Sequence, residues 1–76
     1  MRTKLWVITV TPQAGYGVSY NYIYHNGENA MDKFLELVKE HNLDVVGLLG
    51  DKAIAATAGN HNHIDEVKIY PTYTMD

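Results

Sequence analysis

The chain contains no cysteine, which excludes disulfide bonds, thiolate metal sites and a cysteine nucleophile. It also lacks any apolar run close to the roughly 18–20 residues that a membrane-spanning helix requires. The apolar run near the N-terminus is too short for a secretory signal, and no small-residue cleavage site follows it. Because a chain without cysteine fits a reducing compartment, we expect a soluble, cytoplasmic protein with no membrane contact.

Basic residues are scarce as well. Six lysines and arginines stand against nine aspartates and glutamates, which gives a formal net charge of −3. Nucleic-acid-binding proteins normally carry a basic stripe, and the tyrosine-rich segment of this chain has no lysine or arginine. The charge balance therefore argues against nucleic acid as a partner. It favours a protein partner that presents a basic surface.

The length of 76 residues suffices for one small α+β domain, which we expect to span residues 1–76. A domain of this size buries only about 60% of the surface of its unfolded chain, so its margin of stability is narrow. With no disulfide available, close packing of a single core or burial against a partner must compensate. A second copy of the chain is one such partner, which makes a homodimer one of the expected states.

Residues 29–41 are the one segment whose apolar residues recur at helical spacing, and they predict an amphipathic helix. Its apolar positions are Met31, Phe34, Leu35 and Val38, with Leu37 at the margin of the stripe. Asn29 is the expected N-cap, with Asp32 three positions later as in a capping box. Asn26 is the alternative N-cap and would start the helix one turn earlier.

Alternation of apolar and polar residues predicts strands in the rest of the chain. The expected strands cover residues 3–11, 18–25, 43–49, 52–58 and 64–70. Residues 51–58 have a short helix as their alternative, because alanine is the best helix former. Pro71 suits either an edge position or the end of pairing in the last strand, and residues 72–76 are expected to form a tail.

A lone amphipathic helix must pack its apolar stripe on a sheet, because no second helix is available. The expected fold is therefore α+β: a single helix packed on one face of a four- to five-stranded, mainly antiparallel sheet, in the order β-β-α-β-β-β. One helix covers one face only. The helix-free face should then carry an aromatic or aliphatic patch.

Four tyrosines fall within nine residues: Tyr16, Tyr20, Tyr22 and Tyr24. The last three lie on one face of one predicted strand. Tyrosine combines an apolar ring with a hydroxyl group and is favoured at binding surfaces. Either these rings form a surface that binds a partner, or they face the helix and belong to the core. Alternation alone does not fix which face of the sheet they occupy.

Four carboxylates recur every fourth residue along the helical segment: Glu28, Asp32, Glu36 and Glu40. Residues four apart lie on the same side of a helix, so these acids form one row. Such a row complements a basic partner. The predicted partner-binding residues are therefore the four tyrosines and these four acids.

The chain shows no pattern of residues that indicates an enzyme. Ser19 is the sole serine and lies in a predicted strand, not on a strand-to-helix elbow. The glycines match neither a dinucleotide-binding nor a phosphate-loop pattern. His61 and His63 are two residues apart and suggest a metal- or ligand-binding loop as an alternative function, although a zinc site needs at least three protein ligands. We expect no cofactor.

In size, mild acidity and one-helix layout, the chain resembles the small inhibitors carried by phages and mobile elements, such as anti-CRISPR proteins. The resemblance concerns the layout of the whole chain and no specific residue, and layout does not fix function. It implies a non-enzymatic inhibitor or adaptor that occludes a surface of a larger protein. A structural self-assembly domain is a further alternative.

Overall fold

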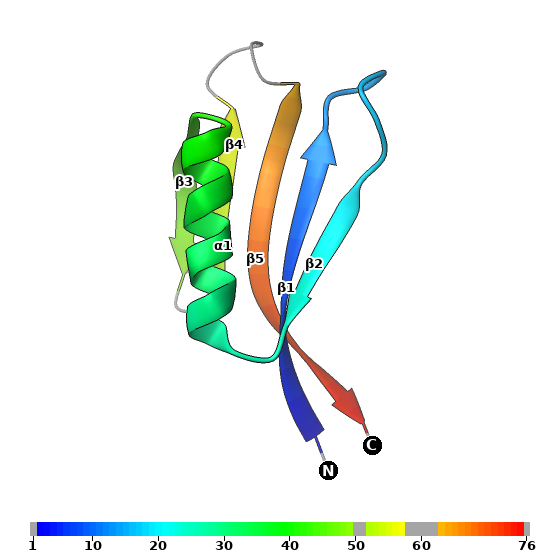
Figure 1. Cartoon of the computed structure of the whole chain (residues 1–76), viewed down its shortest axis with the longest axis vertical. Coiled ribbons are helices and arrows are strands. Elements are labelled where there is room, and N and C mark those ends of the chain that lie inside the picture. Colours follow the sequence, from blue (N-terminus) through cyan, green and yellow to red (C-terminus); the bar gives the residue numbers. More distant parts are fainter. Residues whose placement is uncertain (1, 50–51, 58–62, 76) are drawn as a thin grey trace.

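The computed structural model describes residues 2–49, 52–57 and 63–75 and has one helix packed on a five-stranded antiparallel sheet (Figure 1). The elements in chain order are β1 (Arg2–Pro12), β2 (Tyr20–Tyr24), α1 (Gly27–Glu40), β3 (Leu43–Leu49), β4 (Lys52–Thr57) and β5 (Ile64–Met75). This confirms the predicted α+β fold and the order β-β-α-β-β-β. The alanine-rich segment is a strand, so its helical alternative is wrong for residues 52–57.

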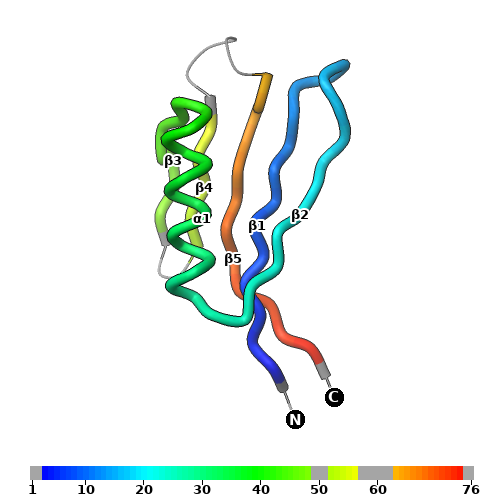
Figure 2. The backbone as a smooth tube through the Cα atoms, in the orientation of Figure 1, coloured from blue at the N-terminus to red at the C-terminus, as the bar shows by residue number. Residues whose placement is uncertain are grey.

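The strands lie side by side in the order β2-β1-β5-β4-β3. Strands that follow each other without the helix between them pair as antiparallel neighbours, and β1 also pairs with β5 from the other end of the chain. Helix α1 connects the two edge strands and lies in front of β3 and β4 in the tube view (Figure 2). The edges of the sheet are therefore β2 and β3.

One hydrophobic core lies between α1 and the sheet. The sheet contributes alternate residues of its inner strands, and the helix contributes Ala30, Phe34 and Leu37. The most completely buried strand residues are Ile8, Val10, Ala53, Ala55, Val67 and Ile69. Period-two alternation places these side chains on the same face, which is the face that α1 covers.

The apolar stripe of α1 is rotated from its predicted position. Leu37, predicted at the margin, is 2% exposed, whereas Leu35 is 51% exposed. Phe34 is buried, with Ala30 and Leu37 one turn to either side of it. Residues at these spacings share one face of a helix, and Leu35 lies about 100° away from that face.

Helix α1 begins one turn earlier than the preferred prediction. Asn26 is the N-cap, and its Oδ1 accepts hydrogen bonds from the backbone N–H groups of Glu28 at 2.8 Å and Asn29 at 3.2 Å. The alternative N-cap is thus confirmed, and the Asn29–Asp32 capping box is wrong. The extended backbone of Asn26 and the following glycine start the helix there.

Replacing Asn26 by alanine is expected to lower the free energy of unfolding by about 1 kcal/mol, because two backbone donors lose their acceptor. Urea unfolding followed by circular dichroism measures the change. Asn29→Ala is the matched control and should have little effect, since Asn29 is exposed inside the helix. A larger loss for Asn29→Ala than for Asn26→Ala would contradict the assigned cap.

Strand β5 continues through Pro71 to Met75, so the end of pairing at Pro71 and the predicted tail are wrong, and the edge alternative for Pro71 is the one that fits. Residues beyond Pro71 pair with the start of β1, as in Thr72 with Leu5. The pairing of β4 with β5 spans only Ile69 to Glu66, so Pro71 has a paired strand on one side only. Proline is tolerated at such an edge-like position because one side needs no N–H donor.

The ends of β1 and β5 form a two-stranded ribbon that extends beyond the other strands, towards the two termini (Figure 1). It makes the molecule elongated, with principal extents of 43 × 23 × 17 Å.

Strand β2 is shorter than predicted, and Val18 lies exposed in the loop before it. Within the described part of the chain, no helix is long and apolar enough to cross a membrane.

Candidate protein-binding site

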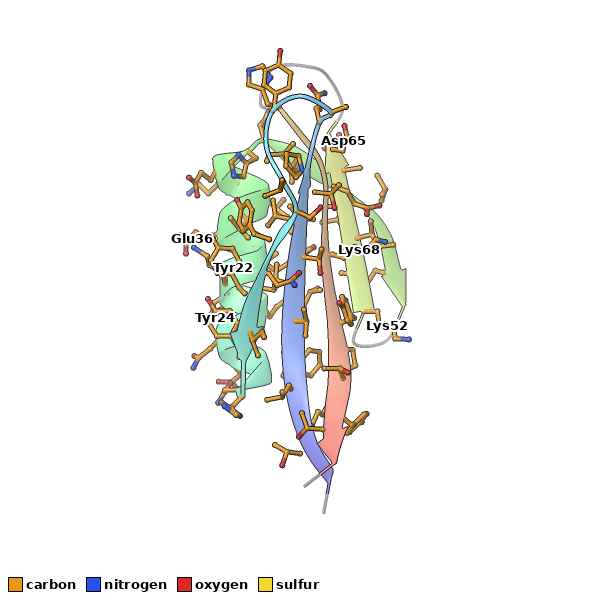
Figure 3. All side chains as sticks on the ribbon, turned by 90° about the vertical axis from the view of Figure 1, so that its right-hand side faces the viewer. Tyr22, Tyr24, Glu36, Lys52, Asp65 and Lys68 are labelled. Atoms are coloured by element: carbon orange, nitrogen blue, oxygen red, sulfur yellow. The ribbon has the colours of Figure 1, made fainter. Side chains whose placement is uncertain are left out.

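The tyrosine row of β2 lies on the helix side of the sheet. Tyr22 pairs with Ile8 and Tyr24 pairs with Trp6, and the paired residues share a face. Figure 3 shows both tyrosines between β2 and α1. They are half-buried and pack against the core. Of the two assignments that the sequence left open, the structure has the one in which the row faces the helix.

Tyr20 and Tyr16 remain exposed at the end of this row. Tyr20 is 42% exposed and meets Tyr22 edge to face, with 5.7 Å between ring centroids. Tyr16 stacks on His63, with 3.8 Å between centroids and 9° between ring planes. The backbone N–H of Gln13 donates to the carbonyl of His63 at 2.9 Å. These contacts hold the loop between β1 and β2 next to the start of β5.

The predicted acidic row is exposed along α1: Glu28, Asp32, Glu36 and Glu40. Lys33 Nζ lies 3.4 Å from Glu36 Oε1 and 4.9 Å from the ring centroid of Tyr22. Lys33 therefore links the acidic row to the tyrosine row. The tyrosine row therefore meets the C-terminal half of the acidic row, Glu36 and Glu40, on the side of α1 that faces β2.

The pKa of the Tyr20 hydroxyl depends on residues of both β2 and α1. Its pKa is raised above the ordinary value of 10.0, first by partial burial and then by the charge and hydrogen bond of Tyr22. The carboxylate of Glu40 raises the pKa further, while Lys33 acts in the opposite direction. An acidic side chain at the C-terminal end of α1 thus acts electrostatically on the exposed tyrosine of β2.

Deprotonation of the Tyr20 hydroxyl is expected to be displaced to higher pH, because its pKa is raised. A raised pKa means that the folded chain holds its proton longer than the unfolded chain, so this contribution to stability is present below pH 10 and is lost at higher pH. Tyrosinate absorbance against pH, compared with Tyr20→Phe, measures it. Glu40→Gln should move the titration of Tyr20 to lower pH, and no movement would contradict the proximity of the two groups.

The histidine loop is only partly described. His63 has a left-handed backbone, with φ of 59°, and stacks on Tyr16, whereas His61 lies outside the described residues. Among the residues that the structure describes, no three histidine or acidic side chains gather as a metal site would require. The described residues around His63 therefore do not form a metal site with three ligands.

The helix-free face of the sheet is mixed in character. Its described side chains include Val7, Ile23, Ile54 and Tyr70, which are interleaved with polar groups. Lys68 forms an ion pair with Glu66 at 3.3 Å, and Figure 3 shows Lys52 and Lys68 on the side of the sheet away from α1. Aliphatic and aromatic residues are present there, as the fold predicted, but charges and hydroxyl groups divide them.

No protein-family model, curated protein or solved structure matches this chain. Its own residues are therefore the basis for any statement about function. The sequence analysis did not predict one group of exposed apolar residues, which lies at the β3 edge of the sheet. It consists of Val45, Val46 and Leu48 of β3 and Leu35 of α1. The apolar run of residues 43–49 was visible, but only the strand order shows that it lies at an edge.

Proposed function

We propose that the chain is a non-enzymatic, cytoplasmic protein-binding module that occludes a basic surface of a larger protein. One observation carries the proposal: the exposed ring of Tyr20 lies beside the carboxylates of Glu36 and Glu40, on the side of the molecule where α1 faces β2. Aromatic rings supply contact area at low cost in side-chain entropy. Carboxylates at the rim of an interface select a partner of opposite charge and speed association.

The proposed contact residues are Tyr16, Tyr20, Tyr22, Tyr24, Glu28, Asp32, Glu36 and Glu40. Their contributions differ with burial. Tyr16 and Tyr20 have the most exposed rings of the four tyrosines, so they are the proposed anchors. Tyr22 and Tyr24 are half-buried and offer only ring edges, while they also support the core. The exposed acids form the rim.

We extend the proposal to the type of action. A domain of 76 residues is about the size that covers one site on a larger protein, and its net charge of −3 suits a basic site. Blocking a basic surface is the action expected of a small acidic inhibitor or adaptor, including an anti-defence protein of a phage. The support for the phage setting is the resemblance in layout alone.

Affinity capture from the cells that encode the chain tests the proposed surface. Wild-type protein is expected to retain a larger protein that the double variant Tyr16→Ala/Tyr20→Ala does not retain. Retention should also fall as the salt concentration rises, because rim charges are screened. The matched control is Tyr73→Ala, which removes an exposed tyrosine from the distant β1–β5 ribbon.

Circular dichroism must show that the double variant remains folded. If the Tyr73→Ala variant loses the captured protein and the double variant keeps it, the proposed surface is wrong. If the wild-type chain retains no larger protein at any salt concentration, the binding function itself is wrong.

A further inference from the structure

Strand β3 exposes apolar side chains along the edge of the sheet opposite β2. Val45, Val46 and Leu48 are exposed, and Leu48 reaches 72%. Asp44 is the sole charged residue of the strand LDVVGLL. Natural edge strands are usually protected by charges, proline or a covering element, because their unpaired N–H and C=O groups can pair with another strand. Besides the charge of Asp44, the described part of this edge has a bulge between Val45 and Gly47 as protection.

Helix α1 adds an apolar side chain above this edge. Lys33 lies on the β2 side of the helix, since it contacts the Tyr22 ring. Phe34 points into the core. Successive helical residues are about 100° apart, so Leu35 lies on the opposite side from Lys33, which is the side facing β3. Leu35 is also exposed, so the apolar surface continues from the strand onto the helix.

Two residues of β3 point to the same side as Leu35. Val45 pairs with Ala55 and Leu48 pairs with Ala53, and both alanines are buried under the helix. Paired residues share a face of the sheet, so Val45 and Leu48 lie on the helix side. The bulge at Val46 sits between them and leaves both on that side.

We propose that β3 pairs antiparallel with β3 of a second copy of this chain, which joins two five-stranded sheets into one. A two-fold axis near Val46 places Val45 of each copy opposite Leu48 of the other. Both pairs lie on the helix side, where the two Leu35 side chains cover them. The strand is thus complementary to itself, with its single charge, Asp44, away from the axis in each copy.

The charges of α1 favour a second copy as the occupant of this edge. In such a pair the two helices are antiparallel, and Leu35 lies near the two-fold axis. Lys39 is four residues after Leu35 and Asp32 is three residues before it, and both are exposed. The two-fold rotation therefore brings Lys39 of one copy level with Asp32 of the other, twice in each pair.

Cysteine crosslinking tests the register, since the natural chain has no cysteine. In the proposed pair, the two copies of residue 46 lie close enough to the axis for a disulfide, which spans Cα separations of about 4.4–6.8 Å. Val46→Cys is expected to form a disulfide-linked dimer under mild oxidation of micromolar protein. Ile23→Cys, exposed at 63% on the opposite edge strand, is the control and should form no disulfide-linked dimer. Equal crosslinking of the two variants would overturn the proposal.

Sedimentation velocity of the unmodified protein gives the second test. The wild type is expected to change from monomer to dimer as its concentration rises. Leu48→Lys should weaken the dimer by at least about tenfold, because each dimer would bury two unpaired ammonium groups. Ile23→Lys should not weaken it. A wild-type chain that remains monomeric at every concentration, or a Leu48→Lys variant that dimerises as tightly as the wild type, would overturn the proposal. Leu48 is not part of the β2–α1 surface, so the outcome of this test is independent of the proposed function.

Discussion

Replacing Phe34 by alanine is expected to lower the free energy of unfolding by about 3–5 kcal/mol. Phe34 is 1% exposed and is among the largest fully buried side chains of the described core. The variant loses the contacts of the ring and leaves a cavity between α1 and the sheet. A domain of 76 residues has a total stability of roughly 4–11 kcal/mol, so the variant should lose a large fraction of its stability. Urea unfolding of dilute protein measures the loss.

Two leucines of α1 provide a matched comparison for this prediction. Leu37→Ala removes a buried side chain and should lower the free energy of unfolding by about 2–5 kcal/mol. Leu35→Ala removes the same atoms from an exposed position and should change it by less than about 1 kcal/mol in dilute protein. Equal losses for the two leucines would show that the helix is rotated from the orientation described above.

Two tyrosines of β2 are expected to have different roles: Tyr22 stabilises the fold, whereas Tyr20 contacts the partner protein. Tyr22→Ala should lower the free energy of unfolding by about 1–3 kcal/mol, because its half-buried ring packs on the core and lies beneath Lys33. Tyr20→Ala should lower it by less than about 1 kcal/mol, since much of its ring is exposed. Thermal unfolding of both variants at equal concentration measures the difference.

The conservative variants complete this test. Tyr22→Phe keeps the ring and should retain most of the stability that Tyr22→Ala loses. Similar losses for Tyr22→Ala and Tyr20→Ala would mean that the two rings are equally buried. In that case Tyr20 could not act as an anchor for a partner, and the division between core and contact residues would fail.

The sequence predicted the elements of this fold because local patterns determine them. Alternation in residues 18–25 and helical spacing around Phe34 each correspond to one face of one element. The fold class followed, because one amphipathic helix with several strands has few ways to bury its apolar face. The N-cap differed by one turn, since Asn26 and Asn29 both suit that position and only the extended backbone of Asn26 distinguishes them.

The edges of the sheet could not be predicted in the same way. The pairing of β1 with β5 joins distant parts of the chain, and no local pattern encodes it. That pairing decides that β3 is an edge strand and that Val46 and Leu48 are exposed. It also explains why Pro71 is accommodated inside a strand. The face occupied by Tyr22 depended likewise on register, which alternation leaves undetermined.

Site-specific photocrosslinking in the cells that encode the chain tests the β2–α1 surface at the level of single residues. A benzophenone amino acid is placed at Tyr20, at Glu36, or at Lys68 on the helix-free face, all of which are exposed. Irradiation is expected to join the first two variants to the same larger protein and to leave the third without that adduct. Adducts to that protein from position 68 but from neither position 20 nor position 36 would show that the chain binds through the other side of its sheet.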